Sequence, residues 1–163
     1  MFNRSFRSNV AALAGILITI GGCSESPAGA GSQFVVREGG ARFDVSGTSS
    51  AVITPAGGSI QTAAGDRIVF PAGAVAEPTT ITLTSSAQYA GVELEPHGLR
   101  FPAGREPVLE ISTVGSNARA FRSLSIVYVD ESGVVAEFLP TAVGGNATQA
   151  NLHHFSGYLI ASH

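Results

Sequence analysis

Short runs of alternating apolar and polar residues, each ended by glycine or proline, constrain the fold of this chain more than any other feature. In TTITLTSS, residues 79–86, Ile81 and Leu83 fall on one side of an extended chain and the threonines on the other. That pattern is typical of a β-strand with one buried face. Similar runs follow from residue 51 onward, and we find no sustained helical periodicity after residue 22. The sequence therefore predicts an all-β fold.

The connections between the predicted strands favour an antiparallel arrangement. In LSIVYVDESGVVAEFL, strands predicted over 124–129 and 134–139 flank Asp130–Gly133, a four-residue segment with a common type I turn composition. FPAG occurs at 70–73 and at 101–104, and we interpret both copies as the same strand-ending turn. No crossover helix is predicted between strands. We therefore expect an antiparallel β-sandwich of about eight or nine short strands.

The first 22 residues have the features of an export signal. Arg4 and Arg7 precede an apolar run over 10–20, and these 11 residues fall short of the roughly 20 that span a bilayer as a helix. The run ends in ITIGGC, whose Cys23 is the only cysteine of the chain. This ending resembles the lipobox of bacterial lipoproteins, with Ile20 in place of the more usual leucine. The resemblance implies cleavage before Cys23 and lipidation of its thiol; the alternative is a buried free thiol after an ordinary signal peptide.

Lipid on Cys23 would hold the chain at a membrane without a spanning helix, because each buried CH₂ contributes roughly 0.8 kcal/mol. The next stretch, SESPAGAGS, has no large apolar residue and predicts a flexible tether. In lipoproteins of this kind, a serine such as Ser24 after the cysteine implies sorting to an outer membrane where one exists. We therefore expect a cell-envelope protein with a signal peptide (1–22), a lipidated cysteine and tether (23–50) and a β-sandwich domain (51–163).

Charge and motif content exclude several classes of function. All nine basic residues are arginines, and after the signal peptide seven of them stand against twelve acidic residues, a net charge of −5. Without a basic stripe to neutralise phosphates, we expect no nucleic-acid binding. A single cysteine excludes an intrachain disulfide. The chain has no Gly-x-Ser-x-Gly, HExxH, P-loop or Rossmann motif, so a hydrolase finds no support.

Three motifs in a fixed order resemble the ZU-five domain, a β-sandwich shared by zona occludens scaffold proteins, netrin receptors of the uncoordinated-five type and ankyrins. The first is GGSI…RIVFPAGAV…TTITLTS, which begins at Gly57–Gly58. The second is EPHGLRFPAGREPVLEI over 95–111, and the third is the triplet His154–Phe155–Ser156. Together they cover roughly residues 54–161. Eukaryotic members sit inside long multidomain chains, so their partners are not transferred to this chain.

The triplet has two interpretations. Some ZU-five domains cleave themselves between the phenylalanine and the serine. Here the Ser156 hydroxyl would attack the Phe155 carbonyl in an N-to-O acyl shift, His154 would act as general base, and water would hydrolyse the ester. Such a step needs a strained peptide and an oxyanion donor, and Gly157 could permit an unusual turn. In the structural interpretation, which we favour, Phe155 is a core residue and His154 and Ser156 share the opposite face of a strand.

Other candidate sites are weaker. His153 and His154 are neighbours that a regular strand aims to opposite sides, and His97 stands in a turn, so we expect no metal site and no cofactor. Glu93 and Glu95 share one strand face near His97, which we interpret as a solvated face rather than a catalytic carboxylate pair.

We therefore expect a non-catalytic, surface-tethered module that binds another protein or an extracellular polymer. In a sandwich, binding residues lie mostly on end loops or an exposed sheet face. In VGSNARAFRS, Arg119 and Arg122 flank Phe121 between predicted strands, and we take this segment as a candidate contact loop. Its alternative is an ordinary loop with one anchoring phenylalanine. The rival function is a self-processing domain, for which the triplet is the only support.

Overall fold

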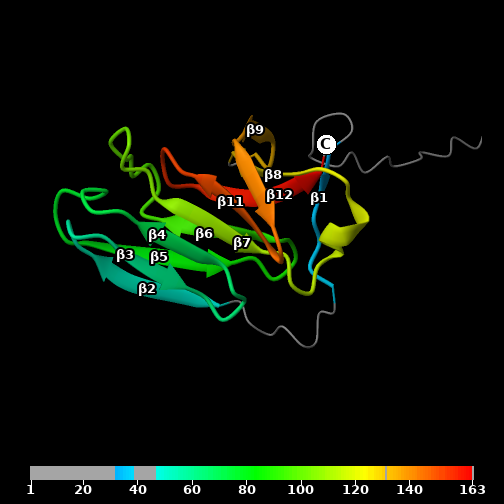
Figure 1. Cartoon of the computed structure of the whole chain (residues 1–163), viewed down its shortest axis with the longest axis horizontal. Coiled ribbons are helices and arrows are strands. Elements are labelled where there is room, and N and C mark those ends of the chain that lie inside the picture. Colours follow the sequence, from blue (N-terminus) through cyan, green and yellow to red (C-terminus); the bar gives the residue numbers. More distant parts are fainter. Residues whose placement is uncertain (1–31, 39–46, 131, 163) are drawn as a thin grey trace, which may run out of the picture.

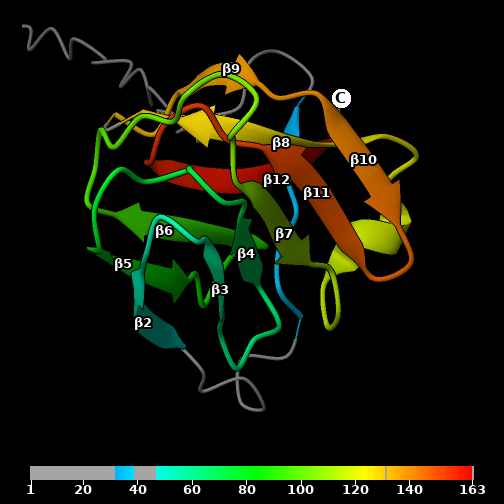
Figure 2. The ribbon, with the colours of Figure 1, turned by 60° about the vertical axis from the view of Figure 1, so that its left-hand side comes forward.

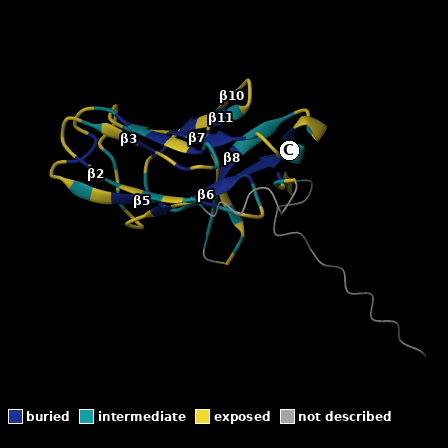
Figure 3. Ribbon diagram, turned by 90° about the horizontal axis from the view of Figure 1, so that it is seen from below, coloured by how far each residue is buried: buried dark blue, intermediate teal, exposed yellow. Residues whose placement is uncertain are grey.

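Two antiparallel sheets pack face to face in the computed structural model, which describes residues 32–38, 47–130 and 132–162 (Figure 1). The predicted signal peptide over 1–22 and Cys23 lie outside these residues. Figure 3 shows β3, β7 and β11 in one layer and β2, β5 and β6 in the other. The antiparallel β-sandwich predicted from the sequence is confirmed.

The larger sheet has the strand order β2-β5-β6-β12-β8-β9, with β1 paired to β12. Its strands are β1 (Gln33–Phe34), β2 (Thr48–Ile53), β5 (Thr79–Ser85), β6 (Gly91–Glu95), β8 (Leu124–Val129), β9 (Val135–Phe138) and β12 (Gly157–Ser162). The smaller sheet, clearest in Figure 2, has the order β10-β11-β7-β4-β3. Its strands are β3 (Gly58–Gln61), β4 (Arg67–Phe70), β7 (Val108–Ser112), β10 (Thr141–Gly144) and β11 (Ala147–Asn151). A short 3₁₀ helix, η1 (Asn117–Ala120), follows β7.

The alternation of apolar and hydroxyl residues in β5 is explained by different contacts on its two faces. Ile81 and Leu83 are fully buried between the sheets. On the other face, Thr84 and Thr82 meet hydroxyl side chains of the neighbouring edge strand β2. The Oγ1 atoms of Thr48 and Thr84 are 3.1 Å apart, and Ser50 Oγ lies 2.8 Å from Thr82 Oγ1. Cross-strand hydroxyl pairs of this kind stabilise an antiparallel ladder.

The two turns that the sequence predicted most directly are both present. In the β8–β9 hairpin, Asp130 Oδ1 accepts hydrogen bonds from the backbone N–H of Ser132 at 2.9 Å and of Val134 at 3.0 Å. The two FPAG copies form the same turn, with a bond from the N–H of Ala74 to the carbonyl of Pro71 and from Arg105 to Pro102. Each copy places its glycine at positive φ, 81° and 77°, as a type II turn requires.

The first strand enters the fold earlier than the predicted domain start at residue 51. Phe34 pairs with Ala161 of β12, and the next residue, Val35, is fully buried. Val36 and Arg37 then form isolated bridges to Tyr89 and Ser116. Part of the stretch predicted as tether, 23–50, is therefore integrated into the sandwich. With β1 and β10 included, the described residues form twelve strands rather than eight or nine.

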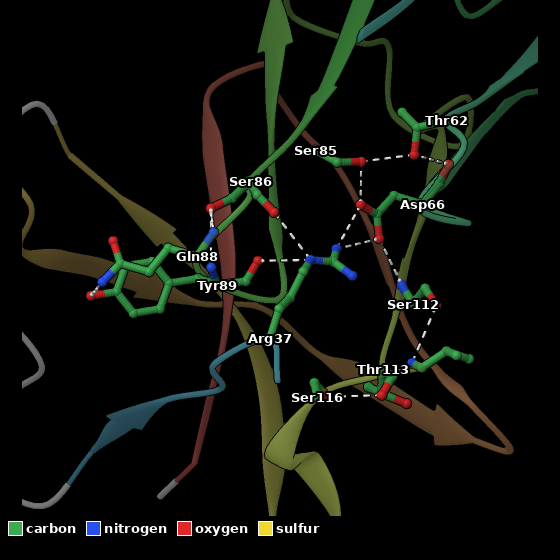
Figure 4. A network of polar contacts seen from close by, with 11 residues as sticks. Arg37, Thr62, Asp66, Ser85, Ser86, Gln88, Tyr89, Ser112, Thr113 and Ser116 are labelled. Atoms are coloured by element: carbon green, nitrogen blue, oxygen red, sulfur yellow. Dashed lines mark hydrogen bonds and ion pairs between the residues drawn. The ribbon is translucent and has the colours of Figure 1, made fainter. Parts of the chain in front are cut away.

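A buried ion pair fixes this N-terminal segment to the body of the sandwich (Figure 4). The Arg37 guanidinium donates from Nη2 to both carboxylate oxygens of Asp66, at 3.0 and 2.8 Å, and the two side chains are 7% and 0% exposed. Its Nε donates to the carbonyls of Ser86 and Tyr89, at 3.1 and 3.0 Å. The segment is thus held by charge-assisted hydrogen bonds.

The Asp66 carboxylate has further partners from both sheets. It accepts hydrogen bonds from the Ser85 hydroxyl at 2.5 Å and from the Ser112 N–H at 2.9 Å. The hydroxyl of Thr62 lies 2.7 Å from that of Ser85, which extends the network (Figure 4). Because Ser85 belongs to β5 and Ser112 to β7, this carboxylate connects the two layers.

Candidate functional site

The triplet His154–Phe155–Ser156 lies in the segment that connects β11 to β12. Phe155 is 1% exposed, and its ring packs against Phe70 and Phe101 at centroid distances of 6.0 and 5.1 Å. Its backbone N–H donates to the carbonyl of Leu99 at 2.9 Å. Phe155 is therefore a core residue, as the structural interpretation of the triplet predicted.

His154 faces a cluster of tyrosines rather than Ser156. Its ring meets that of Tyr128 edge to face at 5.0 Å, and its Nδ1 lies 3.4 Å from the Tyr158 hydroxyl. That hydroxyl donates to the His154 carbonyl at 2.6 Å. His154 and Ser156 share no hydrogen bond within the described part of the chain, and the tyrosine cluster occupies the side of the imidazole that carries Nδ1.

The segment Phe155–Ser156 is hydrogen-bonded to β6 and to the turn that follows it. The N–H of Gly98 donates to the Phe155 carbonyl at 3.1 Å, and the N–H of Leu94 donates to the Ser156 carbonyl at 3.3 Å. Gly98 has φ 75°, whereas Gly157 is not among the glycines at positive φ. The donor that a developing oxyanion at Phe155 would need is thus Gly98 N–H, which the sequence did not suggest.

A histidine–carboxylate pair lies beside this peptide bond. His97 Nε2 is 2.6 Å from Glu93 Oε1, and the two side chains are 57% and 48% exposed. Glu93 therefore pairs with His97 rather than acting with Glu95. The exposure of Glu93 agrees with the interpretation of a solvated strand face. Its pairing with His97 also places a hydrogen-bonded imidazole in the lining of the cavity that contains Ser156.

These groups line an open cavity of about 570 Å³ at the surface. Its polar lining comes from β6 and the turn after it, from the end of β8 and from the triplet. The side chains that line it include Glu93, His97, Arg100, Tyr128, Asp130 and Ser156.

A second cavity of about 280 Å³ adjoins the first. The two cavities share four lining residues, Glu93, Val129, Asp130 and Gly157. In the sheet register, Gly157 of β12 pairs with Glu93 of β6 on one side and with Val129 of β8 on the other. The two cavities therefore form one depression across three neighbouring strands, which we call the cross-strand groove.

Two groups at the groove have shifted pKa values. The hydroxyl of Ser132, followed by the N–H of Val134, stabilises the Asp130 carboxylate and lowers its pKa. Burial, followed by the charge of Glu137, raises the pKa of Tyr158 above its usual value. Asp130 is consequently ionised and Tyr158 neutral at neutral pH.

Two of the three residues of the candidate contact loop line the same cavity. Arg119 belongs to η1 and is exposed, and Phe121 is half-buried against the core. Both line a cavity of about 530 Å³, together with Val114 and Val143, which are 51% and 58% exposed. Arg122 is exposed but does not line this cavity.

The two adjacent histidines have different partners. His153 Nδ1 lies 3.8 Å from Glu106 Oε1, whereas His154 contacts Tyr128 and Tyr158. Residues 32–38, 47–130 and 132–162 contain no group of three His, Cys, Asp or Glu side chains arranged to hold a metal ion. In the same part of the chain, no helix has the length and hydrophobicity needed to cross a membrane.

No known protein-family model matches this chain, and no curated protein matches its sequence. The structure accordingly establishes an all-β, two-sheet antiparallel domain, and the resemblance to ZU-five domains stays a prediction.

Proposed function

We propose that this chain is a lipid-anchored, non-catalytic binding module of a bacterial cell envelope. The observation that carries the proposal is the cross-strand groove, an open surface depression lined by charged and aromatic side chains. Clefts with a few convergent polar groups are the usual places where proteins bind ligands. Glu93, Arg100 and Asp130 supply those groups here.

The anchor in this proposal is Cys23, carrying lipid after removal of residues 1–22. The motif ITIGGC supports this part of the proposal, and Ser24 supports an outer-membrane address. Because β1 begins at Gln33, about ten residues of chain would separate the lipid from the sandwich. The domain would then be presented close to the membrane surface.

We also infer that the domain is ZU-five-like. The support is that each of the three motifs supplies one ring of a single aromatic cluster. Phe70, Phe101 and Phe155 come from the first, second and third motif, and their ring centroids lie 5.1 to 6.2 Å apart. The motifs therefore mark one packing unit rather than three unrelated turns.

The binding function is tested with the intact protein in detergent micelles. Purified insoluble cell-wall polymer and bead-coupled envelope proteins from the source bacterium are each offered to it, and co-sedimentation is measured. We expect binding to one fraction that is weakened in Glu93→Gln and Arg100→Gln. The matched controls Glu77→Gln and Arg105→Gln change exposed residues away from the groove and should bind as the wild type does. Binding to neither fraction, or equal binding by all four variants, would contradict the proposal.

A second candidate function, self-processing, is favoured by one observation. The N–H of Gly98 already donates to the Phe155 carbonyl, where an attack by Ser156 Oγ would develop negative charge. The peptide bond would break as the Ser156 nitrogen accepts a proton, and hydrolysis of the new ester would leave a carboxylate on Phe155. Because the His154 ring faces Tyr128 and Tyr158, the proton would be exchanged by His97, which lines the same cavity as Ser156.

Hydroxylamine separates this candidate from the first, because it cleaves esters far faster than peptide bonds. If an ester between Phe155 and Ser156 forms, hydroxylamine should yield a separate C-terminal fragment, detected under denaturing conditions, from the wild type and not from Ser156→Ala. If the wild type stays intact under the same treatment, self-processing is excluded and the binding module remains.

A further inference from the structure

We propose that the cross-strand groove binds a neutral polysaccharide chain. This inference rests on the proposed function, in which the groove is the binding site, and it names the class of ligand that the groove would accept. The choice depends on four properties of the groove: the strands that form its floor, the side chains on its walls, its charge and its openness.

The floor of the groove offers no free backbone edge. Gly157 of β12 pairs with Glu93 and with Val129 on its two sides, so this strand lies inside the sheet. An extended peptide that binds by adding a strand needs an unpaired edge for its main-chain hydrogen bonds. A ligand in this groove must therefore be recognised by side chains.

The side chains on the walls suit a ligand rich in hydroxyl groups. Glu93, Asp130 and Arg100 end in planar groups with two or more hydrogen-bonding atoms each. The Arg100 guanidinium can bond a pair of neighbouring hydroxyls. Glu93 Oε1 and Asp130 Oδ1 are engaged by His97 and by the β8–β9 turn, so the second oxygen of each carboxylate would accept from the ligand. Hydrogen bonds to charged partners are the stronger ones. The ring of Tyr128, packed against His154 at 5.0 Å, adds an apolar surface for the C–H face of a sugar ring.

The charge of the groove selects against an anionic polymer. Gly157 pairs with Glu93 on one side and with Val129, the neighbour of Asp130, on the other. Both carboxylates line the smaller cavity, whose other lining residues are hydroxyl-bearing or apolar, without any basic side chain. A uronic acid or phosphate group placed there would meet two carboxylates at close range. A neutral chain, by contrast, uses the same carboxylates as acceptors.

The groove is open and has a glycine, Gly157, on its floor, which favours a polymer over a small molecule as the ligand. The two adjoining cavities, of about 570 and 280 Å³, share Gly157 as a common lining residue. A Cβ atom at this position would lie 2.9 Å from Glu93 Oε2, so a side chain there would displace the carboxylate and narrow the passage between the cavities. The glycine keeps the two continuous.

Isothermal titration calorimetry on the intact protein in detergent tests the inference. The probes are cellohexaose, the hexamer of β-1,4-linked N-acetylglucosamine, and hexagalacturonate as the anionic comparison. We expect at least one neutral hexamer to bind, with hexagalacturonate at least about tenfold weaker. Loss of one hydrogen bond to a charged group should weaken binding about tenfold in Glu93→Gln and in Arg100→Gln. Glu77→Gln and Arg105→Gln should bind as the wild type does.

The outcomes separate this inference from the proposed function. If no hexamer binds while envelope proteins still co-sediment in a way that depends on Glu93 and Arg100, the polysaccharide inference is overturned and the binding module stands. If hexagalacturonate binds as well as the neutral hexamers, the charge argument is wrong. If neither hexamers nor envelope fractions bind, both proposals fail together.

Discussion

Asp66 is a fully buried carboxylate, and the stability of the sandwich depends on the individual residues that bind it. It receives hydrogen bonds from Arg37, from the Ser85 hydroxyl and from the N–H of Ser112. A buried charge without its partner is strongly destabilising, because desolvation is no longer offset by attraction and hydrogen bonding. The residues around Asp66 therefore act as one unit that links the N-terminal segment to both layers.

The substitution Arg37→Met should lower the free energy of unfolding by about 3–5 kcal/mol, because it leaves Asp66 buried and unpaired. Urea unfolding followed by circular dichroism measures the change. Arg105→Met, which removes an exposed arginine, should have an effect near zero. The double variant with Asp66→Leu should recover part of the loss; a single variant as stable as the control would contradict this account.

The substitution Tyr158→Phe should lower the free energy of unfolding by about 1 kcal/mol at neutral pH, because it removes the hydrogen bond to the His154 carbonyl. Since burial raises the pKa of Tyr158, folding favours its neutral form. An unfolded tyrosine ionises near pH 10, so this contribution is complete below about pH 10 and is lost as pH rises further. Urea unfolding at several pH values should show the advantage of the wild type constant below about pH 9 and shrinking above about pH 10. A constant difference up to about pH 11 would argue against it.

At the scale of elements, β6 and β12 approach each other unusually closely at Gly91. A Cβ atom there would lie 2.6 Å from the Tyr158 carbonyl oxygen and 2.3 Å from Leu159 Cδ2. Backbone atoms cannot move aside without breaking the strand pair, so the close approach depends on glycine. This pairing also positions the Phe155–Ser156 peptide bond against the turn after β6.

We expect Gly91→Ala to be destabilising by about 1–3 kcal/mol, as overpacked core positions are. Gly144→Ala is the matched strand glycine, because its Cβ would meet nothing within 4 Å and its φ is not positive. There the lower chain entropy of alanine should raise stability slightly. Thermal unfolding of both variants measures the contrast, and equal effects would show that the close approach does not constrain the strands.

Strand β11 carries a buried hydroxyl without a partner. Thr148 is 0% exposed, and its Oγ1 is the buried side-chain atom that finds no hydrogen bond in the described residues. Thr148→Val removes this polar atom at nearly constant shape and should raise the free energy of unfolding by about 1 kcal/mol. Thr62→Val, where the lost hydroxyl is hydrogen-bonded to Ser85, should instead lower it by about 1–3 kcal/mol. Chemical denaturation of the two variants measures both changes. A lower free energy of unfolding in both would mean that Thr148 Oγ1 has a hydrogen-bond partner in solution.

The strands that the sequence predicted are those with local patterns. Alternation in β5 and the turn composition between β8 and β9 are readable within a dozen residues. Strand β1 consists of two residues and pairs with a strand about 128 positions away, so no local pattern predicts this pairing. Strand β10, with the sequence TAVG, has no alternation either and is fixed by its pairing with β11.

At the scale of the whole molecule, the sequence predicted some residues of the candidate site but not how they are brought together. The triplet and the turn at His97 stood out as motifs, and the burial of Phe155 followed from strand periodicity. That Gly98 N–H meets the Phe155 carbonyl depends on how the β6 turn and β12 are brought together, which is a property of the fold. The Arg37–Asp66 pair was not predicted, because two charges 29 positions apart carry no local sign of contact.

The place of β12 in the whole molecule affects how cleavage must be detected. This strand pairs with β6, with β8 and with β1. A fragment released by a cut after Phe155 would therefore stay bound inside the larger sheet, and a native preparation would look intact. Only denaturing conditions distinguish the two proposed functions at this bond.

The most direct test of the account is the intact mass, under denaturing conditions, of the full protein purified from the cells that produce it. Cys23→Ser and Ser156→Ala are measured alongside. A lipid-anchored, uncut binding module predicts one species with the mass of residues 23–163 plus acyl chains, unchanged by Ser156→Ala and without lipid in Cys23→Ser. Two fragments split between Phe155 and Ser156, absent in Ser156→Ala, or a wild-type mass without lipid, would contradict it.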